Sequence, residues 1–134
     1  MHTGKKVIYW ADDDFEDLDL FQEVLAELAP ELELRQFPNG KLLLDQLHTE
    51  GPGHYPALIV LDINMPVLDG RETLALLKKE EKFASIPIVV FTTSNSELDK
   101  HFFEWMHTEM LTKPFTYNAL KNTLQKILGY VKND

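Results

Sequence analysis

The chain has 134 residues, of which 44% are hydrophobic and 26% charged. This length suits one domain with a substantial core, and the composition argues against an intrinsically disordered chain. The sum of 13 basic and 22 acidic residues is a net charge of -9, which argues against non-specific binding to nucleic acid or anionic membrane and favours cationic partners, including metal ions. Because there is no cysteine, disulfides, thiolate nucleophiles and zinc-thiolate sites are excluded.

The amino-terminal stretch, MHTGKKVIYWADDD, carries only a short apolar run before three aspartates. Such a run is too short for a membrane span, and the stretch lacks the pattern of a secretory signal peptide. We therefore expect a soluble, cytoplasmic protein that forms a single domain over residues 1–134.

Five strands are predicted in chain order. Three are nearly continuous apolar runs, typical of strands covered on both faces of a sheet: Lys5–Ala11, Ala57–Leu61 and Ile86–Phe91. Leu32–Phe37 alternates apolar and polar residues, as an edge strand with one wet face does. Glu109–Thr112 is short and also fits an edge.

A helix is predicted after each strand, from apolar residues at helical spacing and from capping residues. The expected helices are 14–28, 41–47, 71–82, 96–107 and one from Thr116 that carries Leu120, Leu124, Ile127 and Leu128, followed by a tail at 129–134. Alternating strands and helices with right-handed crossovers give an α/β fold with a five-stranded parallel sheet of order 2-1-3-4-5 and helices on both faces. This is the flavodoxin-like, doubly wound arrangement.

Reactive side chains follow four of these strands at the same predicted edge of the sheet. Asp12 and Asp13 follow the first strand, Asp62 the third, Thr92 the fourth and Lys113 the fifth. Clustered carboxylates repel one another, so one must be protonated or a cation must neutralise them. Oxygen ligands without a nearby histidine or cysteine suit Mg²⁺ best. The lysine ammonium and the threonine hydroxyl would stabilise a phosphoryl group during transfer to a carboxylate.

Four motifs carry a family resemblance: VIYWADDD, LIVLDINMPVLDG, PIVVFTTS and LTKPF. Through them the chain resembles, over nearly its whole length, the receiver domain of bacterial two-component response regulators. The segment ADDDFEDLDLF is similar to the single-domain branch without an output domain. The resemblance implies a signalling module that switches partner binding, and no enzymatic activity beyond its own phosphorylation and dephosphorylation.

The resemblance also implies residue roles. Asp62 would accept a phosphoryl group from the phosphohistidine of a sensor kinase or phosphotransfer protein, with Thr92 and Lys113 contacting that group. Mg²⁺ would be bound by Asp13, Asp62 and the backbone carbonyl of Asn64, with Asp12 acting largely through water.

The chain departs from the family pattern on the strand before the lysine. Receivers usually carry Tyr or Phe three residues before the lysine, where this chain has Met110. The usual aromatic rotation is therefore not expected here. Receivers also usually have a cis peptide before the proline that matches Pro114.

Three alternatives remain. A haloacid-dehalogenase-type phosphatase is loosely matched by Asp12-x-Asp14, Thr92 and Lys113, but it needs an acidic metal-binding motif after the lysine, where only Asp134 remains. A flavodoxin shares the topology, but its phosphate loop is rich in Ser, Thr and Gly, whereas three aspartates repel phosphate. A receiver-like scaffold that is never phosphorylated is the third. Asp14 itself fits a helix cap better than a metal ligand.

Overall fold

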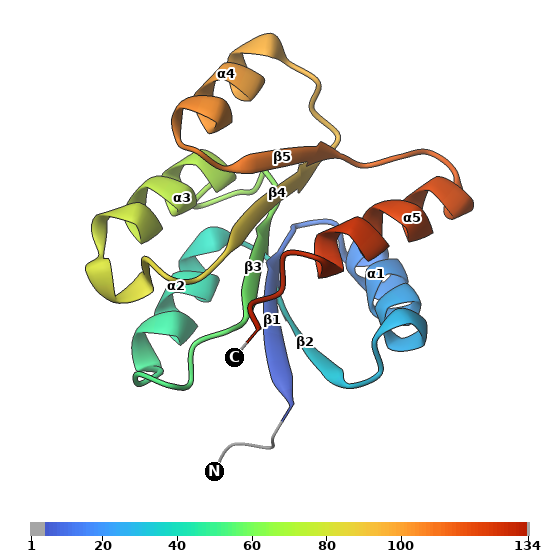
Figure 1. Cartoon of the computed structure of the whole chain (residues 1–134). Coiled ribbons are helices and arrows are strands. Elements are labelled where there is room, and N and C mark those ends of the chain that lie inside the picture. The colour runs from blue at the N-terminus through green and yellow to red at the C-terminus, as the bar shows by residue number, and fades with distance from the viewer. Residues whose placement is uncertain (1–4, 134) are drawn as a thin grey trace.

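The structure is a computed structural model, and it describes residues 5–133. Residues 1–4, which are part of the stretch considered above as a signal peptide, lie outside the described residues, as does Asp134. One sheet contains five parallel strands in the order β2-β1-β3-β4-β5 (Figure 1). The strands are β1 (Lys6–Ala11), β2 (Leu32–Phe37), β3 (Leu58–Leu61), β4 (Ile88–Thr92) and β5 (Glu109–Thr112). The predicted order and both predicted edge strands are confirmed.

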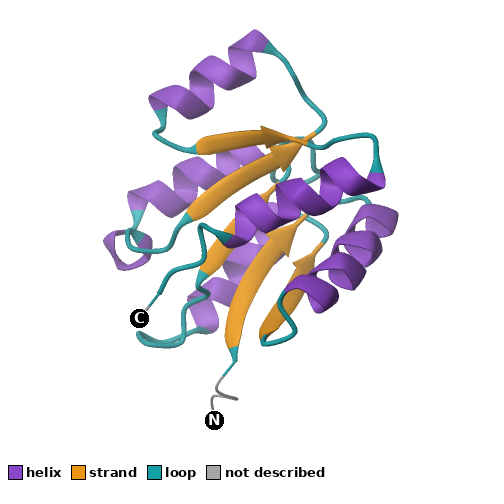
Figure 2. Cartoon of the chain, turned by 45° about the vertical axis from the view of Figure 1, so that its right-hand side comes forward, coloured by secondary structure: helices purple, strands orange, loops and turns teal. Residues whose placement is uncertain are grey.

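Helices cover both faces of this sheet, which confirms the doubly wound fold (Figure 2). They are α1 (Phe15–Leu28), α2 (Gly40–Thr49), α3 (Gly70–Lys79), α4 (Glu97–Trp105) and α5 (Tyr117–Leu128). Helices α1 and α5 lie on one face, whereas α2 and α3 lie on the other, and α4 lies beside the β5 edge (Figure 1). Within residues 5–133, no helix combines the length and apolarity needed to span a membrane.

The period of two along the central strands divides the apolar side chains between two cores. In β1, Ile8 and Trp10 join the core under α1 and α5, whereas Tyr9 and Ala11 join the core under α2 and α3. Each of these four side chains is almost fully buried. Because burying one large apolar side chain stabilises a fold by about 1.5–3 kcal/mol, both faces of β1 contribute to stability.

Each helix begins at a residue whose side chain accepts a hydrogen bond from a backbone N–H three residues on. These caps are Asp14, Asn39, Asp69, Ser96 and Thr116. Such a bond satisfies a donor that has no partner within the helix. The predicted cap at Asp14 is confirmed.

Two predicted helices are shorter than expected. Helix α3 ends at Lys79, and the chain then makes a 3₁₀ turn, η1 (Glu81–Phe83), which buries Phe83. Helix α4 ends at Trp105, and His107 has a left-handed φ of 54°. The left-handed backbone terminates helical hydrogen bonding, so the predicted extension to residue 107 is wrong.

The carboxyl-terminal segment is docked, not a free tail. The Lys132 N–H donates to the Ala57 carbonyl at 2.9 Å, and the Lys6 ammonium donates to the Lys132 carbonyl at 2.6 Å. Tyr130 and Val131 pack against the core under α1 and α5.

The backbone of residues 5–133 contains no cis peptide bond. The expected cis bond before Pro114 is therefore wrong. The trans isomer is the lower-energy form of an X–Pro bond by about 0.5–1 kcal/mol.

Candidate functional site

The structure brings four sequence-predicted side chains to one edge of the sheet. Asp12 directly follows β1, Asp62 follows β3, Thr92 is the last residue of β4 and Lys113 follows β5. All four are buried, with exposed fractions of 0% for Asp12 and Thr92 and 8% for Asp62 and Lys113. Ligands of open α/β sheets bind at this carboxyl edge, so the position agrees with a functional site.

A close backbone approach fixes the loop that follows Asp62. The Gly70 N–H donates to the Ile63 carbonyl at 2.8 Å. A Cβ at position 70 would lie 2.3 Å from the Asp62 carbonyl oxygen, so only glycine lets α3 begin here. Within the loop, Asp62 Oδ1 accepts from the Ile63 N–H at 2.7 Å, which leaves Oδ2 facing Lys113.

The Lys113 ammonium binds three carboxylates. It lies 2.7 Å from Asp12 Oδ2, 2.8 Å from Asp17 Oδ2 and 3.3 Å from Asp62 Oδ2. The sequence prediction missed Asp17. Its position in the first turn of α1, directly after the acidic run, was the available indication.

Burial and the contacts within this cluster shift the pKa values of Asp12 and Lys113. Burial raises the pKa of Asp12 to about 6, against the lowering effect of hydrogen bonds from Lys113 and from the Asp14 N–H. Burial alone would lower the pKa of Lys113, but hydrogen bonds to Asp12 and Asp17 hold it above its ordinary value. Lys113 therefore stays charged, and the cluster favours any further cation.

The acidic residues can also hold a metal ion. Carboxylate oxygens of Asp12, Asp13 and Asp62 lie within 4.8 Å of one another, and Asp13 is exposed to solvent. Asn64 is exposed in the loop after Asp62. An all-oxygen ligand set that is partly open to water fits Mg²⁺. Asp14, in contrast, caps α1 through its side chain.

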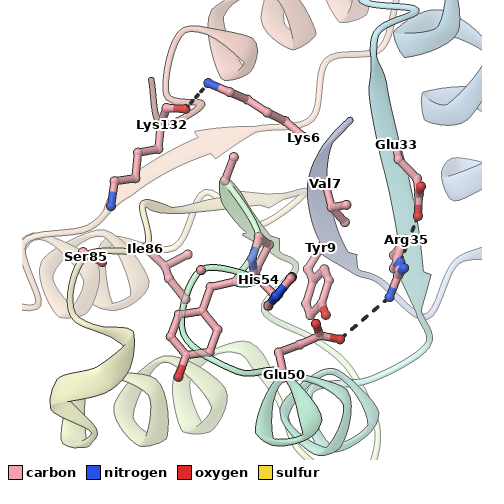
Figure 3. Close-up of a pocket in the computed structure, with 14 residues that line it drawn as sticks. Lys6, Val7, Tyr9, Glu33, Arg35, Glu50, His54, Ser85, Ile86 and Lys132 are labelled. Atoms are coloured by element: carbon pink, nitrogen blue, oxygen red, sulfur yellow. Dashed lines mark hydrogen bonds and ion pairs between the residues drawn. The ribbon is translucent and has the colours of Figure 1, made fainter. Parts of the chain in front are cut away.

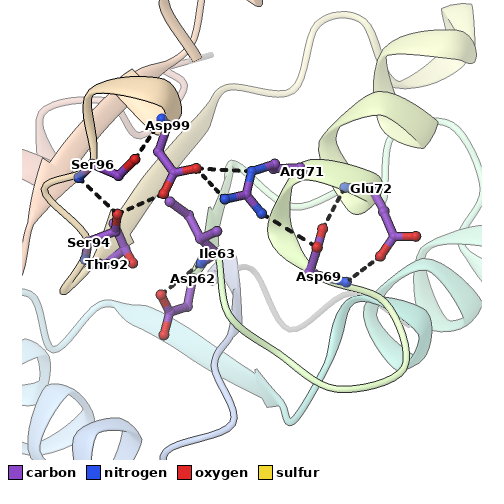
Figure 4. A network of polar contacts seen from close by, with 9 residues as sticks. All are labelled: Asp62, Ile63, Asp69, Arg71, Glu72, Thr92, Ser94, Ser96 and Asp99. Carbon is purple, nitrogen blue, oxygen red and sulfur yellow. Dashed lines mark hydrogen bonds and ion pairs between the residues drawn. The ribbon is translucent and has the colours of Figure 1, made fainter. Parts of the chain in front are cut away.

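Thr92 is linked to the loop that follows β4. The Ser94 N–H donates to Thr92 Oγ1 at 3.3 Å, and the Ser94 hydroxyl donates to Asp99 Oδ2 at 2.7 Å (Figure 4). Because β4 pairs with β3, Thr92 and Asp62 lie on neighbouring strand ends.

The departure from the family pattern, Met110, lies on β5, which packs beside α4. Met110 is half-buried and packs against the core under α2 and α3, whereas Trp105 is 75% exposed. Trp10 is 1% exposed and lies in the other core. Trp105 is therefore a surface residue and Trp10 a packing residue.

A separate cavity of about 470 Å³ lies at the opposite, amino edge of the sheet (Figure 3). Tyr9, Glu50, Arg35 and His54 are among its lining residues. Arg35 Nε donates to Glu33 at 2.9 Å, and Arg35 Nη1 lies 4.0 Å from Glu50. The cavity is lined from the other end of β1, so it is separate from the acidic site.

Residues 8–125 match the family model described as the response regulator receiver domain. Among curated proteins, "Response regulator Rcp1" of Synechocystis is 39% identical over 97 residues, which are 70% of this chain and 66% of that protein. "Probable methanogenesis regulatory protein FilR2" of Methanothrix harundinacea is 37% identical over 95 residues, 69% of this chain and 61% of that protein. The matches thus span less than two-thirds of the length of either relative.

Solved structures agree in fold. The phosphorylated cyanobacterial phytochrome response regulator RcpA has a TM-score of 0.85 at 31% identity, over 96% of this chain and 94% of that chain. The Mn²⁺-bound form of Rcp1 has a TM-score of 0.81 at 36% identity, over 91% of both chains. The family model matches most of the sequence, and the carboxyl ends of the strands bring the acidic residues and Lys113 together. The chain therefore belongs to the response regulator receiver domain family.

Proposed function

We propose that this receiver domain is the phosphoacceptor of a two-component phosphorelay and that Asp62 is its phosphorylation site. The phosphodonor is the phosphohistidine of a sensor histidine kinase or a histidine phosphotransfer protein. The observation that carries this proposal is the position of Asp62 Oδ2, 3.3 Å from the Lys113 ammonium and beside the carboxylates of Asp12 and Asp13.

The reaction is a phosphoryl transfer from nitrogen to oxygen. An Asp62 carboxylate oxygen attacks phosphorus, the phosphorus–nitrogen bond breaks, and its electron pair returns to the imidazole ring of the donor. The product is an acyl phosphate on Asp62. Lys113 offsets charge on the transferred oxygens, and the Thr92 hydroxyl donates a hydrogen bond to one of them.

Asp12, Asp13, Asp62 and the backbone carbonyl of Asn64 are the proposed Mg²⁺ ligands. When bound, the ion supplies positive charge that offsets repulsion between the carboxylates and the incoming phosphoryl group. The structure of Rcp1 is described as Mn²⁺-bound and that of RcpA as phosphorylated. Both descriptions support the same chemistry in the present chain.

Phosphorylation would act by switching the binding of a downstream protein in the cytoplasm, without any other enzymatic reaction. The acidic charge of the chain supports a protein partner over nucleic acid or membrane. The receiver-domain family model, matched over residues 8–125, favours this proposal over the phosphatase alternative.

Incubation with acetyl phosphate and Mg²⁺ tests the proposal. We expect a single acid-stable, base-labile acyl phosphate per chain, mapped to Asp62 by mass spectrometry. Asp62→Asn should abolish the label, whereas Asp45→Asn, at an exposed position on α2, should keep it. Labelling of Asp62→Asn at the wild-type yield would show that the assignment is wrong.

A further inference from the structure

A chain of polar contacts joins α3 to α4 across the loop after β4 (Figure 4). Arg71, near the start of α3, donates from Nε to Asp99 Oδ1 at 3.0 Å, and its Nη2 donates to the same oxygen. The other carboxylate oxygen of Asp99 accepts from the Ser94 hydroxyl at 2.7 Å. We call Arg71, Asp99 and Ser94 the clasp.

The clasp is a main attachment of α4. Only Asp99 and Phe103 are buried in this helix, whereas Leu98 and Trp105 are 82% and 75% exposed. Although burial raises the pKa of Asp99, hydrogen bonds from Ser94 and Arg71 hold it below its usual value. A buried carboxylate that loses such partners is destabilised, so α4 depends on them to stay in place.

The other end of the clasp reaches the phosphorylation site. Ser94 uses its N–H to bind Thr92 Oγ1 at 3.3 Å and its hydroxyl to bind Asp99. A movement of Thr92 toward a phosphoryl group on Asp62 would carry the Ser94 backbone with it. The bond from the Ser94 hydroxyl to Asp99 would then lengthen or break, since the short serine side chain moves with its backbone and cannot extend to follow Asp99.

We propose that the clasp transmits the phosphorylation state of Asp62 from Thr92 to α4, and that it holds α4 in its unphosphorylated position. The inference rests on the proposed function. It assigns Arg71, Asp99 and Ser94 as positioning residues. They would take the role of the aromatic ring that receivers usually carry at the position of Met110. Met110 is flexible and half-buried, so it can fill a gap without a two-position flip.

Backbone hydrogen exchange of the unmodified protein tests the first half of the proposal. In Arg71→Gln, we expect the amides of α4 to exchange about tenfold faster than in wild type, because a charged hydrogen-bonding partner is lost. The matched control is Lys78→Gln, which removes a positive charge from an exposed position on the same helix. Unchanged protection of α4 in Arg71→Gln, with β3 protected as in wild type, would overturn the clasp.

Beryllofluoride with Mg²⁺ tests the second half. In wild type, its addition should speed exchange in α4; in Ser94→Ala and Arg71→Gln, this response should be lost or strongly reduced. Met110→Ala should keep the response. A wild-type response in Ser94→Ala, or its loss only in Met110→Ala, would overturn the coupling.

Acetyl phosphate labelling of the same samples separates the two proposals. Both clasp variants should still be labelled at Asp62. If wild type itself takes no label at Asp62, the proposed function fails, and the exchange of unmodified Arg71→Gln still decides whether the clasp holds α4.

Discussion

The Lys113 ammonium lies 2.8 Å from Asp17 Oδ2, nearly as close as to Asp12 at 2.7 Å and closer than to Asp62 at 3.3 Å. Asp17 therefore competes with Asp62 for the positive charge that a phosphoryl group needs. It also places a further negative charge beside the site. Because Asp17 is about one-third exposed, water screens part of both effects.

Asp17→Asn should therefore strengthen the binding of beryllofluoride in the presence of Mg²⁺ by about three- to tenfold. The variant removes a like charge and frees one Lys113 donor for the bound anion. A fluorescence titration measures the affinity, with Asp19→Asn on the same helix as the charge-matched control. Weaker binding would mean that Asp17 holds Lys113 in its productive position.

Mg²⁺ should stabilise the fold by mass action. A hundredfold excess over the dissociation constant adds about 2.7 kcal/mol to the free energy of unfolding. Asp13→Asn should raise the metal-free stability, since it relieves repulsion with Asp12 and Asp62, and should remove most of the Mg²⁺ effect. Thermal unfolding with and without the ion measures both changes, and Glu16→Gln serves as control. A wild-type melting temperature that ignores millimolar Mg²⁺ would argue against the site.

The fold and the strand-end residues were predictable because their determinants are local. Continuous apolar runs mark buried strands, and a parallel sheet brings their carboxyl ends to one edge. Asp12, Asp62, Thr92 and Lys113 follow from that rule alone.

The remaining contacts were not predictable, because they join side chains distant in sequence. Nothing near Arg71 indicates that it pairs with Asp99. The position of Asp17 after the acidic run indicates that it lies near the site, but it does not indicate the pairing with Lys113. Docking of residues 130–133 depends likewise on the Ala57 carbonyl and on Lys6. Such pairs depend on helix positions that apolar periodicity does not specify.

Val67 adopts a strained backbone conformation in the loop between Asp62 and α3. Its φ is 69°, and the Leu68 N–H donates to the Pro66 carbonyl at 2.8 Å, a tight three-residue turn. For a β-branched residue this φ is an outlier that costs about 1–2 kcal/mol. The side chain is 74% exposed, so it gains little from packing.

Val67→Asn should raise the free energy of unfolding by about 1 kcal/mol, because asparagine tolerates a positive φ better than a β-branched residue does. Chemical denaturation measures the change. Val67→Ile is the matched control, since it keeps the β-branch and should give no gain. Equal stabilities of the two variants would contradict the strain.

Tyr9, which lines the cavity at the amino edge of the sheet, should make the stability of the fold depend on pH. Burial, and then the negative charge of Glu50, raise the pKa of its phenol from 10.0 to about 12. The folded state therefore favours the neutral phenol. This contribution to stability is complete below pH 10, the ordinary pKa, and is lost as the pH rises toward about 12.

Tyr9→Phe cannot ionise, so its stability should fall less steeply than that of wild type between about pH 10 and about pH 12. A two-unit shift corresponds to about 2.7 kcal/mol at most. Below pH 10 the variant should be less stable than wild type by about 1 kcal/mol, because it lacks the hydroxyl that forms hydrogen bonds with Gln46 and Glu50. Urea unfolding across this pH range measures both effects, with the half-exposed Tyr117→Phe as control. Parallel curves for wild type and Tyr9→Phe above pH 10 would show that Tyr9 ionises as freely in the folded chain as in the unfolded one.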